Sequence, residues 1–147
     1  MGPPPPTSAS PLLLPLPVTS LTAGVLGLLH TTLAVAVVLV RRSRQIAYGD
    51  GGDKLLARRL RAHGNASEYI PIFLILLALV EVQALVGPGA LMGVAALFVV
   101  GRIMHGGTFL GTRPFMLGRV GGTFLTLAPI ATLAVVLVLL GRVGLGV

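Results

Sequence analysis

Charged and polar side chains enter an apolar part of the sequence near residue 61. Arg61, Asn65 and Glu68 lie at positions i, i+4 and i+7, so a helix would place them on one face. Tyr69 lies beside Glu68, and residues 72–80, which follow, are all apolar. A charge at membrane depth costs about 2.5–3.5 kcal/mol on insertion scales, so these groups are expected to face protein, one another or a polar ligand. The pattern favours either a structural Arg61–Glu68 ion pair between helices or a ligand-binding site.

Two further polar clusters lie far from this one in the sequence. Arg102 and His105 are at positions i and i+3 of another apolar segment, with Phe109 one turn further along the same face. Arg119 stands at the start of a later apolar segment, with Thr123 one turn beyond it. Charge inside such segments indicates side chains that face protein or a polar cavity.

The composition is that of an integral membrane protein. The 147 residues are enough for one domain, but 54% are hydrophobic and only 10% are charged, against about 25% charged in soluble domains. The sequence contains no cysteine, which excludes disulfides, thiolate metal sites and a cysteine nucleophile. Any thiol chemistry must therefore come from a bound cofactor.

The net charge of +7 does not indicate nucleic-acid binding. The basic residues lie between the apolar segments, where they set topology and contact anionic lipid, and no aromatic residues alternate with them for base stacking. A metal site is not expected either. His30, His63 and His105 lack metal-ligand spacing, and His30 is expected at a different membrane depth from the other two.

The predicted fold is all-α, a transmembrane four-helix bundle. Residues 1–17 are rich in proline and are expected to form a flexible tail, and residues 142–147 a C-terminal tail. The predicted helices span residues 18–40, 58–86, 90–109 and 119–140. At 1.5 Å per residue, 20 or more residues cross a hydrocarbon core of about 30 Å.

The lysine and arginine residues predict the orientation. The connection between the first two helices and its flanks hold Arg41, Arg42, Arg44, Lys54, Arg58, Arg59 and Arg61. The connection between the last two helices and its flanks hold Arg102, Arg113 and Arg119. The opposite side holds Arg142. The positive-inside rule therefore predicts both termini outside and the polar clusters converging near the cytoplasmic interface. The expected site is a polar pocket open to the cytosol, with apolar walls.

Glycine spacing suggests close helix packing. The pairs Gly89/Gly93, Gly107/Gly111 and Gly118/Gly122 each match the small-xxx-small pattern. Because the chain holds 20 glycines, some of these matches are expected by chance.

Residues 61–71, Arg-Ala-His-Gly-Asn-Ala-Ser-Glu-Tyr-Ile-Pro, resemble the signature of the MAPEG family, the membrane-associated proteins in eicosanoid and glutathione metabolism. Every fixed position of the family pattern is present: Arg, Ala, a polar residue, Asn, Glu, Tyr and Pro. The resemblance covers residues 18–141, and His63-Gly64 with a short connection between the last two helices looks like the bacterial branch. The high content of Ala, Gly, Leu and Arg also indicates a bacterial source, so an inner-membrane location is expected.

The resemblance implies a homotrimer that binds glutathione in a cleft between subunits near the cytoplasmic face. The positions that would contact glutathione are Arg61, His63, Asn65, Glu68, Tyr69 and Arg102. Arg41 matches an arginine implicated in catalysis in part of the family, and Arg119 is our choice for a second catalytic arginine over Arg113. The implied activity is that of a glutathione transferase or peroxidase acting on a small lipophilic electrophile from the membrane lipid.

The chain departs from the transferase pattern on the third helix. His105 and Phe109 stand where transferase members place tyrosines, although His105 can donate a hydrogen bond or act as a base. One alternative is a non-catalytic membrane protein that holds lipid or another small anion in the cleft. A second is a small transporter subunit, which the clustering of polar residues at one face disfavours.

Overall fold

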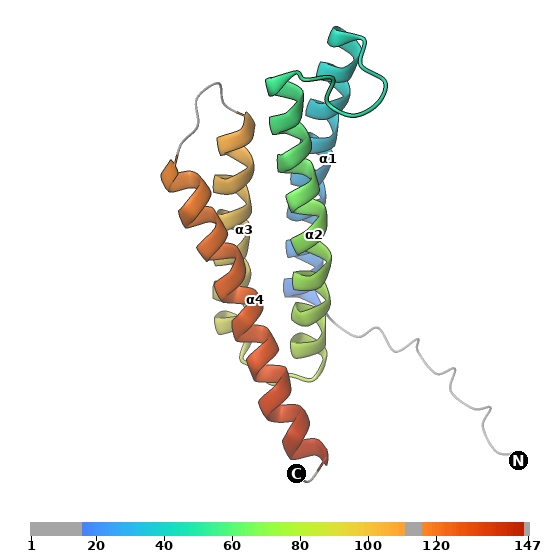
Figure 1. The fold of residues 1–147 in the computed structure, drawn as a ribbon. Helices are drawn as coiled ribbons and strands as arrows, with labels where there is room; N and C mark the ends of the chain where they lie inside the picture. Colours follow the sequence, from blue (N-terminus) through green and yellow to red (C-terminus); the bar gives the residue numbers. More distant parts are fainter. Residues whose placement is uncertain (1–15, 111–115, 146–147) are drawn as a thin grey trace, which may run out of the picture.

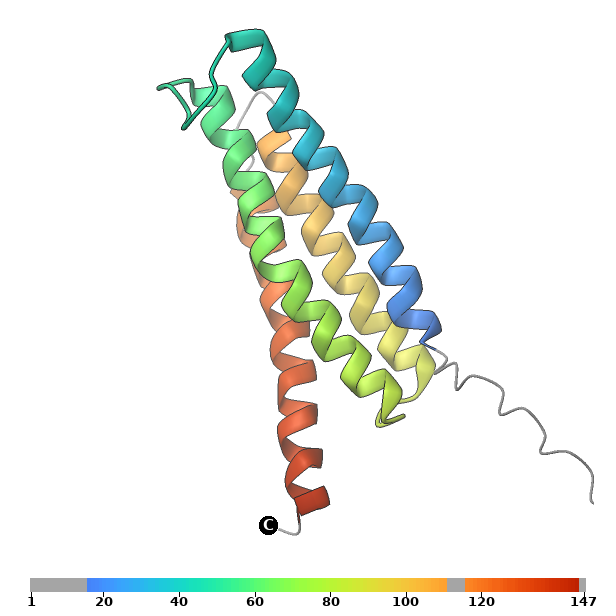
Figure 2. The same ribbon diagram turned by 90° about the vertical axis from the view of Figure 1, so that its right-hand side faces the viewer.

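The computed structural model describes residues 16–110 and 116–145, and their secondary structure is helical, with no strand. The four helices are α1 (Pro17–Arg44), α2 (Lys54–Val82), α3 (Pro88–Leu110) and α4 (Met116–Leu145). They run alternately up and down, so the α1–α2 connection, the end of α3 and the start of α4 lie at one end of the bundle (Figures 1 and 2). Each helix is long and apolar enough to cross a membrane. The prediction of an all-α, four-helix membrane bundle is confirmed.

Some expectations fall on residues outside the described ranges. They are almost all of the proline-rich tail, residues 1–15, the candidate Arg113, and the last two residues of the predicted C-terminal tail. The rest of that predicted tail, to Leu145, is the end of α4.

Local capping sets helix ends that hydropathy places only roughly. Helix α2 begins four residues before the predicted start because the Asp53 carboxylate accepts a hydrogen bond of 2.8 Å from the backbone N–H of Leu56. It ends at Val82 instead of residue 86, and Ala84 just beyond it has a left-handed backbone with φ of 50°. Helix α1 continues past residue 40 and ends at Arg44. Its C-cap residue, Gln45, also has a left-handed backbone conformation.

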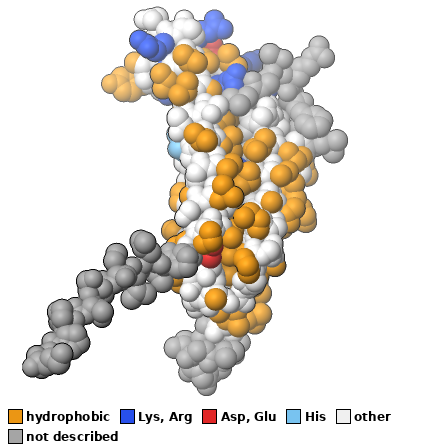
Figure 3. Space-filling model, turned by 180° about the vertical axis from the view of Figure 1, so that it is seen from behind, with side chains coloured by type: hydrophobic (Ala, Val, Ile, Leu, Met, Phe, Trp, Pro, Cys, Tyr) orange, Lys and Arg blue, Asp and Glu red, His pale blue; other side chains and the backbone are white. Residues whose placement is uncertain are grey.

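One stripe of α2 forms the centre of the core. Its buried residues from Ala62 to Val80 pack against α1 and α3, and the rings of Phe73 and Phe98 stack with centroids 3.7 Å apart. Many large apolar side chains lie on the outside instead. Seen from behind, the body of the molecule carries hydrophobic side chains while lysine and arginine gather at one end (Figure 3). This distribution suits a bundle surrounded by lipid with one basic end.

Helices α3 and α4 approach closely at two glycines. A methyl group on Gly122 would lie 2.8 Å from the backbone nitrogen of His105, and one on Gly101 would lie 2.8 Å from the backbone of Leu125. Of the glycines in the small-xxx-small pairs, Gly89, Gly93 and Gly107 face open space. The close contact therefore uses Gly122 and a glycine outside those pairs, and it places α3 backbone directly against α4.

At the opposite end, a carboxylate joins α1 to α2. The two oxygens of Glu81 accept hydrogen bonds of 2.8 Å from the backbone N–H groups of Val18 and Thr19. These N–H groups belong to the first turn of α1, where the helix itself offers no acceptor. Glu81 thus caps α1 and fixes its start relative to the end of α2.

Candidate functional site

A cavity of about 690 Å³ opens between α2, α3 and α4 near the basic end. Its polar lining includes four of the predicted site residues, Arg61, Asn65, His105 and Arg119. The remaining lining residues are Phe109, Met116, Val120, Thr123, Phe124 and Leu127. The structure therefore brings residues from all three sequence clusters around one cavity with a largely apolar α4 wall.

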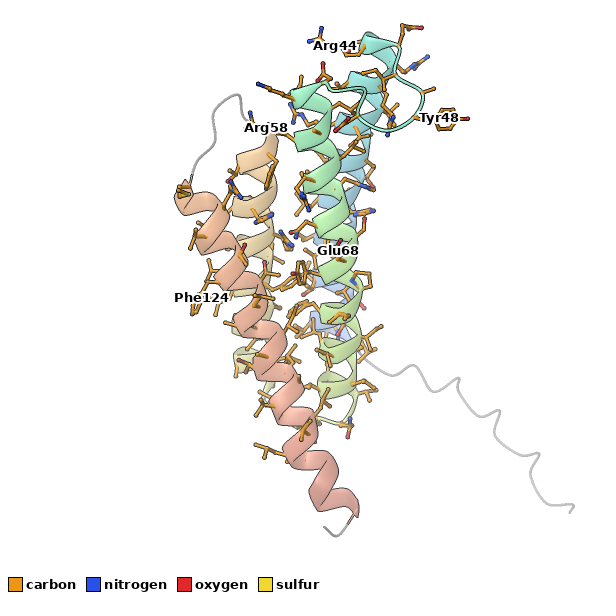
Figure 4. The ribbon with its side chains drawn as sticks, viewed as in Figure 1. Arg44, Tyr48, Arg58, Glu68 and Phe124 are labelled. Carbon is orange, nitrogen blue, oxygen red and sulfur yellow. The ribbon has the colours of Figure 1, made fainter. Side chains whose placement is uncertain are left out.

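A second cavity of about 360 Å³ lies on the exposed face of α2. It is lined by Asp50, Ala57, Leu60, Arg61, Gly64, Asn65 and Glu68. Arg61 and Asn65 line both cavities, so a polar compartment with two carboxylates adjoins the apolar one. Figure 4 labels Glu68 on α2, which lines the polar cavity, and Phe124 on α4, which lines the apolar cavity.

Arg102 supports this junction from the core. Its side chain is 2% exposed, and both Nη1 and Nη2 donate hydrogen bonds of 2.9 Å to the Asn65 side-chain oxygen. The guanidinium also lies 5.7 Å from the centre of the Tyr69 ring. Its Nε is buried without a hydrogen-bond partner, and among the described residues no carboxylate pairs with it. A neutral amide and a ring face therefore compensate a buried positive charge that an anion would complement better.

The α3–α4 wall holds an imidazole beside a hydroxyl. His105 is 8% exposed, and its Nδ1 lies 3.5 Å from the Thr123 hydroxyl oxygen. That hydroxyl donates to the carbonyl of Arg119 at 2.8 Å, so it is left to accept from Nδ1–H. This arrangement favours Nε2 as the nitrogen with a free lone pair. The Phe109 ring lies 5.1 Å from His105 and 5.8 Å from the Arg119 guanidinium.

Four predicted site residues line neither cavity: Arg102 and Tyr69, which are described above, and His63 and Arg41. His63 packs against His30 of α1, with ring centroids 4.5 Å apart. The expectation that these two histidines lie at different depths was wrong, because the antiparallel pairing of α1 and α2 places them opposite each other. Among the described residues, no three histidine or acidic side chains gather as a metal site would require. Arg41 donates to the carbonyls of Ile46 and Ala47 at 3.3 and 3.2 Å and lines a separate cavity.

The structural Arg61–Glu68 ion pair does not form within the described chain. An ion pair joins Arg44 to Asp53 at 3.2 Å, whereas Arg61 and Glu68 are both exposed. Their charges are therefore available to a ligand or to a neighbouring molecule.

Sequence reasoning missed part of the cavity lining. The α4 residues Met116, Val120, Phe124 and Leu127 recur at helical spacing beside the predicted Arg119 and Thr123, a signal that could have marked this wall in advance. Asp50 comes from the glycine-rich α1–α2 connection and reaches the polar cavity only because that loop folds over α2. The spacing of residues along the sequence contains no comparable signal for Asp50.

Comparison with known proteins identifies relatives of this chain. Its sequence is 38% identical over 89 residues to Inner membrane protein YecN of Escherichia coli strain K12, and equally so to YecN of strain CFT073. The match covers 60% of this chain and 66% of YecN, just under two thirds of that relative. No solved structure matches the chain.

The relative and the four apolar helices confirm the prediction of a multi-pass inner membrane protein. The model of the MAPEG family matches residues 19–139, which include all the predicted site residues. The chain therefore belongs to the MAPEG family.

Proposed function

We propose that this protein binds glutathione across the two connected cavities and acts as a glutathione transferase or peroxidase on lipophilic electrophiles. The observation that carries the proposal is that Arg61 and Asn65 line both a polar, carboxylate-containing cavity and an apolar one. Glutathione combines charged groups, which suit the polar cavity, with a reactive thiol that could meet a lipophilic molecule in the apolar one.

The charged groups of the site match those of glutathione. The tripeptide has two carboxylates and an ammonium group. The guanidinium groups of Arg61 and Arg119 suit the carboxylates, and the Glu68 carboxylate suits the ammonium. The buried guanidinium of Arg102 behind Asn65 adds positive potential without needing to touch the ligand. Two guanidinium groups and one of the two carboxylates of the site therefore match the charged groups of the molecule in sign.

When bound, glutathione supplies a thiol whose thiolate form is the nucleophile. Arg61 and Arg102 favour that anionic form because nearby positive charge stabilises it. His105 and Arg119 line the same cavity, where an imidazole could form a hydrogen bond and a guanidinium could stabilise developing negative charge. Val120, Phe124 and Leu127 offer the apolar surface on which a lipophilic electrophile would lie.

A homotrimer is part of the proposal. Glu68 stands at the middle of α2, inside a candidate membrane span, and is exposed. A carboxylate facing lipid at that depth is costly, so a second copy or a ligand is expected to cover it. We also propose that His63 and Arg41 act from a neighbouring copy, since in their own chain they line neither cavity.

A non-catalytic role is the second candidate, and one observation favours it. The third-helix side chains that line the cavity are an imidazole and a phenyl ring, His105 and Phe109, so that wall offers no phenol to a bound thiol. In this case the cleft would hold glutathione, lipid or another small anion without turnover.

Calorimetric titration of glutathione into the detergent-solubilised protein tests binding. We expect saturable binding in the wild type and a loss of about tenfold or more for Arg61→Ala and for Glu68→Gln, since hydrogen bonds to charged groups contribute about 1.5–3 kcal/mol. Arg44→Ala is the control, because Arg44 is paired with Asp53 outside both cavities. Absence of binding in the folded wild type would overturn the proposal.

Turnover separates the two candidate functions. The same protein is mixed with glutathione and a chlorodinitrobenzene or an alkyl hydroperoxide, and thiol consumption is measured against protein-free controls. Catalysis predicts a rate well above background that falls in Arg119→Ala. Binding without any rate above background would leave the non-catalytic role.

A further inference from the structure

A third cavity, of about 420 Å³, lies at the basic end of α1, apart from the two cavities described above. It is lined by Val38, Arg41, Arg42, Gln45, Ile46 and Ala47. The left-handed turn at Gln45 folds the chain back beside the last turn of α1, and backbone N–H groups of Gln45 and Ile46 satisfy carbonyls there. Few backbone carbonyls at this helix end are therefore left to accept hydrogen bonds from the arginine side chains in place of a ligand.

The three arginines that end α1 differ in their partners. Arg44 pairs with Asp53, and Arg41 is held by the carbonyls of Ile46 and Ala47. The guanidinium of Arg42 makes no hydrogen bond or ion pair with any described residue, and the residue is exposed; its backbone carbonyl accepts hydrogen bonds from Gln45. The cavity thus contains one guanidinium fixed in place and one whose charge is uncompensated, an arrangement that complements an anion.

An exposed apolar stripe runs along α1 from this cavity into the membrane-spanning part of the helix. Leu28, Val35, Val38 and Leu39 are 73%, 49%, 51% and 61% exposed, and all lie within one side of the helix below Arg42. The distance along the axis from Arg42 to Leu28 is about 21 Å at 1.5 Å per residue. This is close to the length of an extended phospholipid acyl chain. The view of the molecule from behind shows the same distribution, hydrophobic along the body and basic at one end (Figure 3).

We propose that this surface is a binding site for an anionic phospholipid. The lipid phosphate lies in the cavity at the guanidinium groups of Arg42 and Arg41, and an acyl chain lies along Leu28, Val35 and Leu39. Basic pockets at the ends of transmembrane helices recognise anionic headgroups, and the apolar stripe distinguishes a lipid from a free phosphate. This cavity is separate from the two cavities proposed for glutathione, and Arg41 is the one residue that both proposals use.

Native mass spectrometry of the full chain in detergent tests the proposal. The protein is mixed with equal amounts of phosphatidylglycerol and phosphatidylcholine that carry identical acyl chains, and the adducts retained after mild activation are counted. Wild type is expected to retain phosphatidylglycerol preferentially. Arg42→Gln is expected to lower that preference about fivefold, the effect of one basic side chain at a lipid surface. The control Arg44→Gln removes the same charge two residues away, from a residue outside the cavity, and is expected to keep most of the preference.

Three outcomes would overturn the proposal. Equal retention of the two lipids by the wild type would show no headgroup recognition. Equal losses in Arg42→Gln and Arg44→Gln would show a general charge effect in place of a site. Displacement of phosphatidylglycerol by millimolar inorganic phosphate would show a site for a soluble anion, whereas persistence of the lipid adduct supports the acyl contact. Circular dichroism of both variants checks that the helices are retained.

Discussion

At the scale of single residues, the most unusual interaction is a buried arginine held by an amide. Both terminal nitrogens of Arg102 share the Asn65 oxygen, and the described residues place no carboxylate against it. An ion left partly unpaired in a core costs several kcal/mol after relaxation, so the two hydrogen bonds are important for keeping this side chain inside the bundle. The same pair positions Asn65 at the junction of the two candidate ligand cavities.

Asn65→Ala is expected to destabilise the protein by about 3 kcal/mol, because it leaves a buried guanidinium without its side-chain acceptor. Asn65→Asp is expected to stay near wild type, since a carboxylate would accept both bonds and balance the charge. Thermal unfolding in detergent measures both. The control Ser67→Ala removes an exposed hydroxyl bonded to its own helix and is expected to change stability by less than about 0.5 kcal/mol. Similar losses for Asn65→Ala and Ser67→Ala would contradict this account.

Glu81 provides a second single-residue effect, at the other end of the bundle. Glu81→Gln replaces a charged cap with a neutral amide that offers one acceptor instead of two, so α1 is expected to fray at its start at a cost of about 1 kcal/mol. Hydrogen exchange at the Val18 and Thr19 amides is expected to accelerate. Gln83→Ala, which removes a side chain bonded within its own helix, is the matched control. Unchanged exchange in Glu81→Gln would show that the cap contributes little.

At the scale of helices, the closest packing joins α3 to α4. Gly101 and Gly122 let backbone meet backbone, and this contact determines which face of α4 looks toward His105. Thr123, one residue after Gly122, is therefore the α4 side chain that meets the imidazole. The shape of the larger cavity therefore depends on the contact at Gly101 and Gly122, although neither glycine has a side chain that could bind a ligand.

Gly122→Ala is expected to destabilise the bundle by about 2 kcal/mol, because the added methyl would overlap the α3 backbone, which cannot move aside like a flexible side chain. Gly93→Ala is the control within α3, where a methyl group meets open space and alanine is expected to be neutral or stabilising by up to about 1 kcal/mol. The unfolding midpoints of the two variants in the same detergent provide the comparison. A midpoint for Gly122→Ala at or above wild type would mean that the helices separate without penalty.

At the scale of the whole molecule, the up-and-down arrangement gathers the polar clusters at one end. Arg41, Arg58 and Arg119 come from three helices and lie at the end that holds the α1–α2 connection. There Arg58, labelled in Figure 4, donates to the carbonyl of Thr108 at the end of α3. The positive-inside rule predicts that this end is cytoplasmic.

The absence of cysteine from the chain makes a direct test of orientation simple. Tyr48→Cys places a thiol at a position that is 91% exposed in the α1–α2 connection, and Gly87→Cys places one in the exposed turn at the other end. In intact cells, a membrane-impermeant maleimide is expected to label Gly87→Cys but not Tyr48→Cys, while a permeant maleimide labels both. Labelling of Tyr48→Cys alone by the impermeant reagent would reverse the assigned orientation.

The sequence by itself determined the helices and the general location of the site. The length of an apolar run and the position of an arginine beside it are local properties, so four spans, a basic end and the stripe of Arg61, Asn65 and Glu68 can be read directly. Tertiary structure decided which of these side chains meet. Which side chains face each other depends on the rotation and axial register of each helix. Packing at Phe73–Phe98 and at Gly101–Gly122 sets both. That is why His63 lies against His30, Arg102 binds Asn65, and Thr123 faces His105, none of which residue spacing alone could predict.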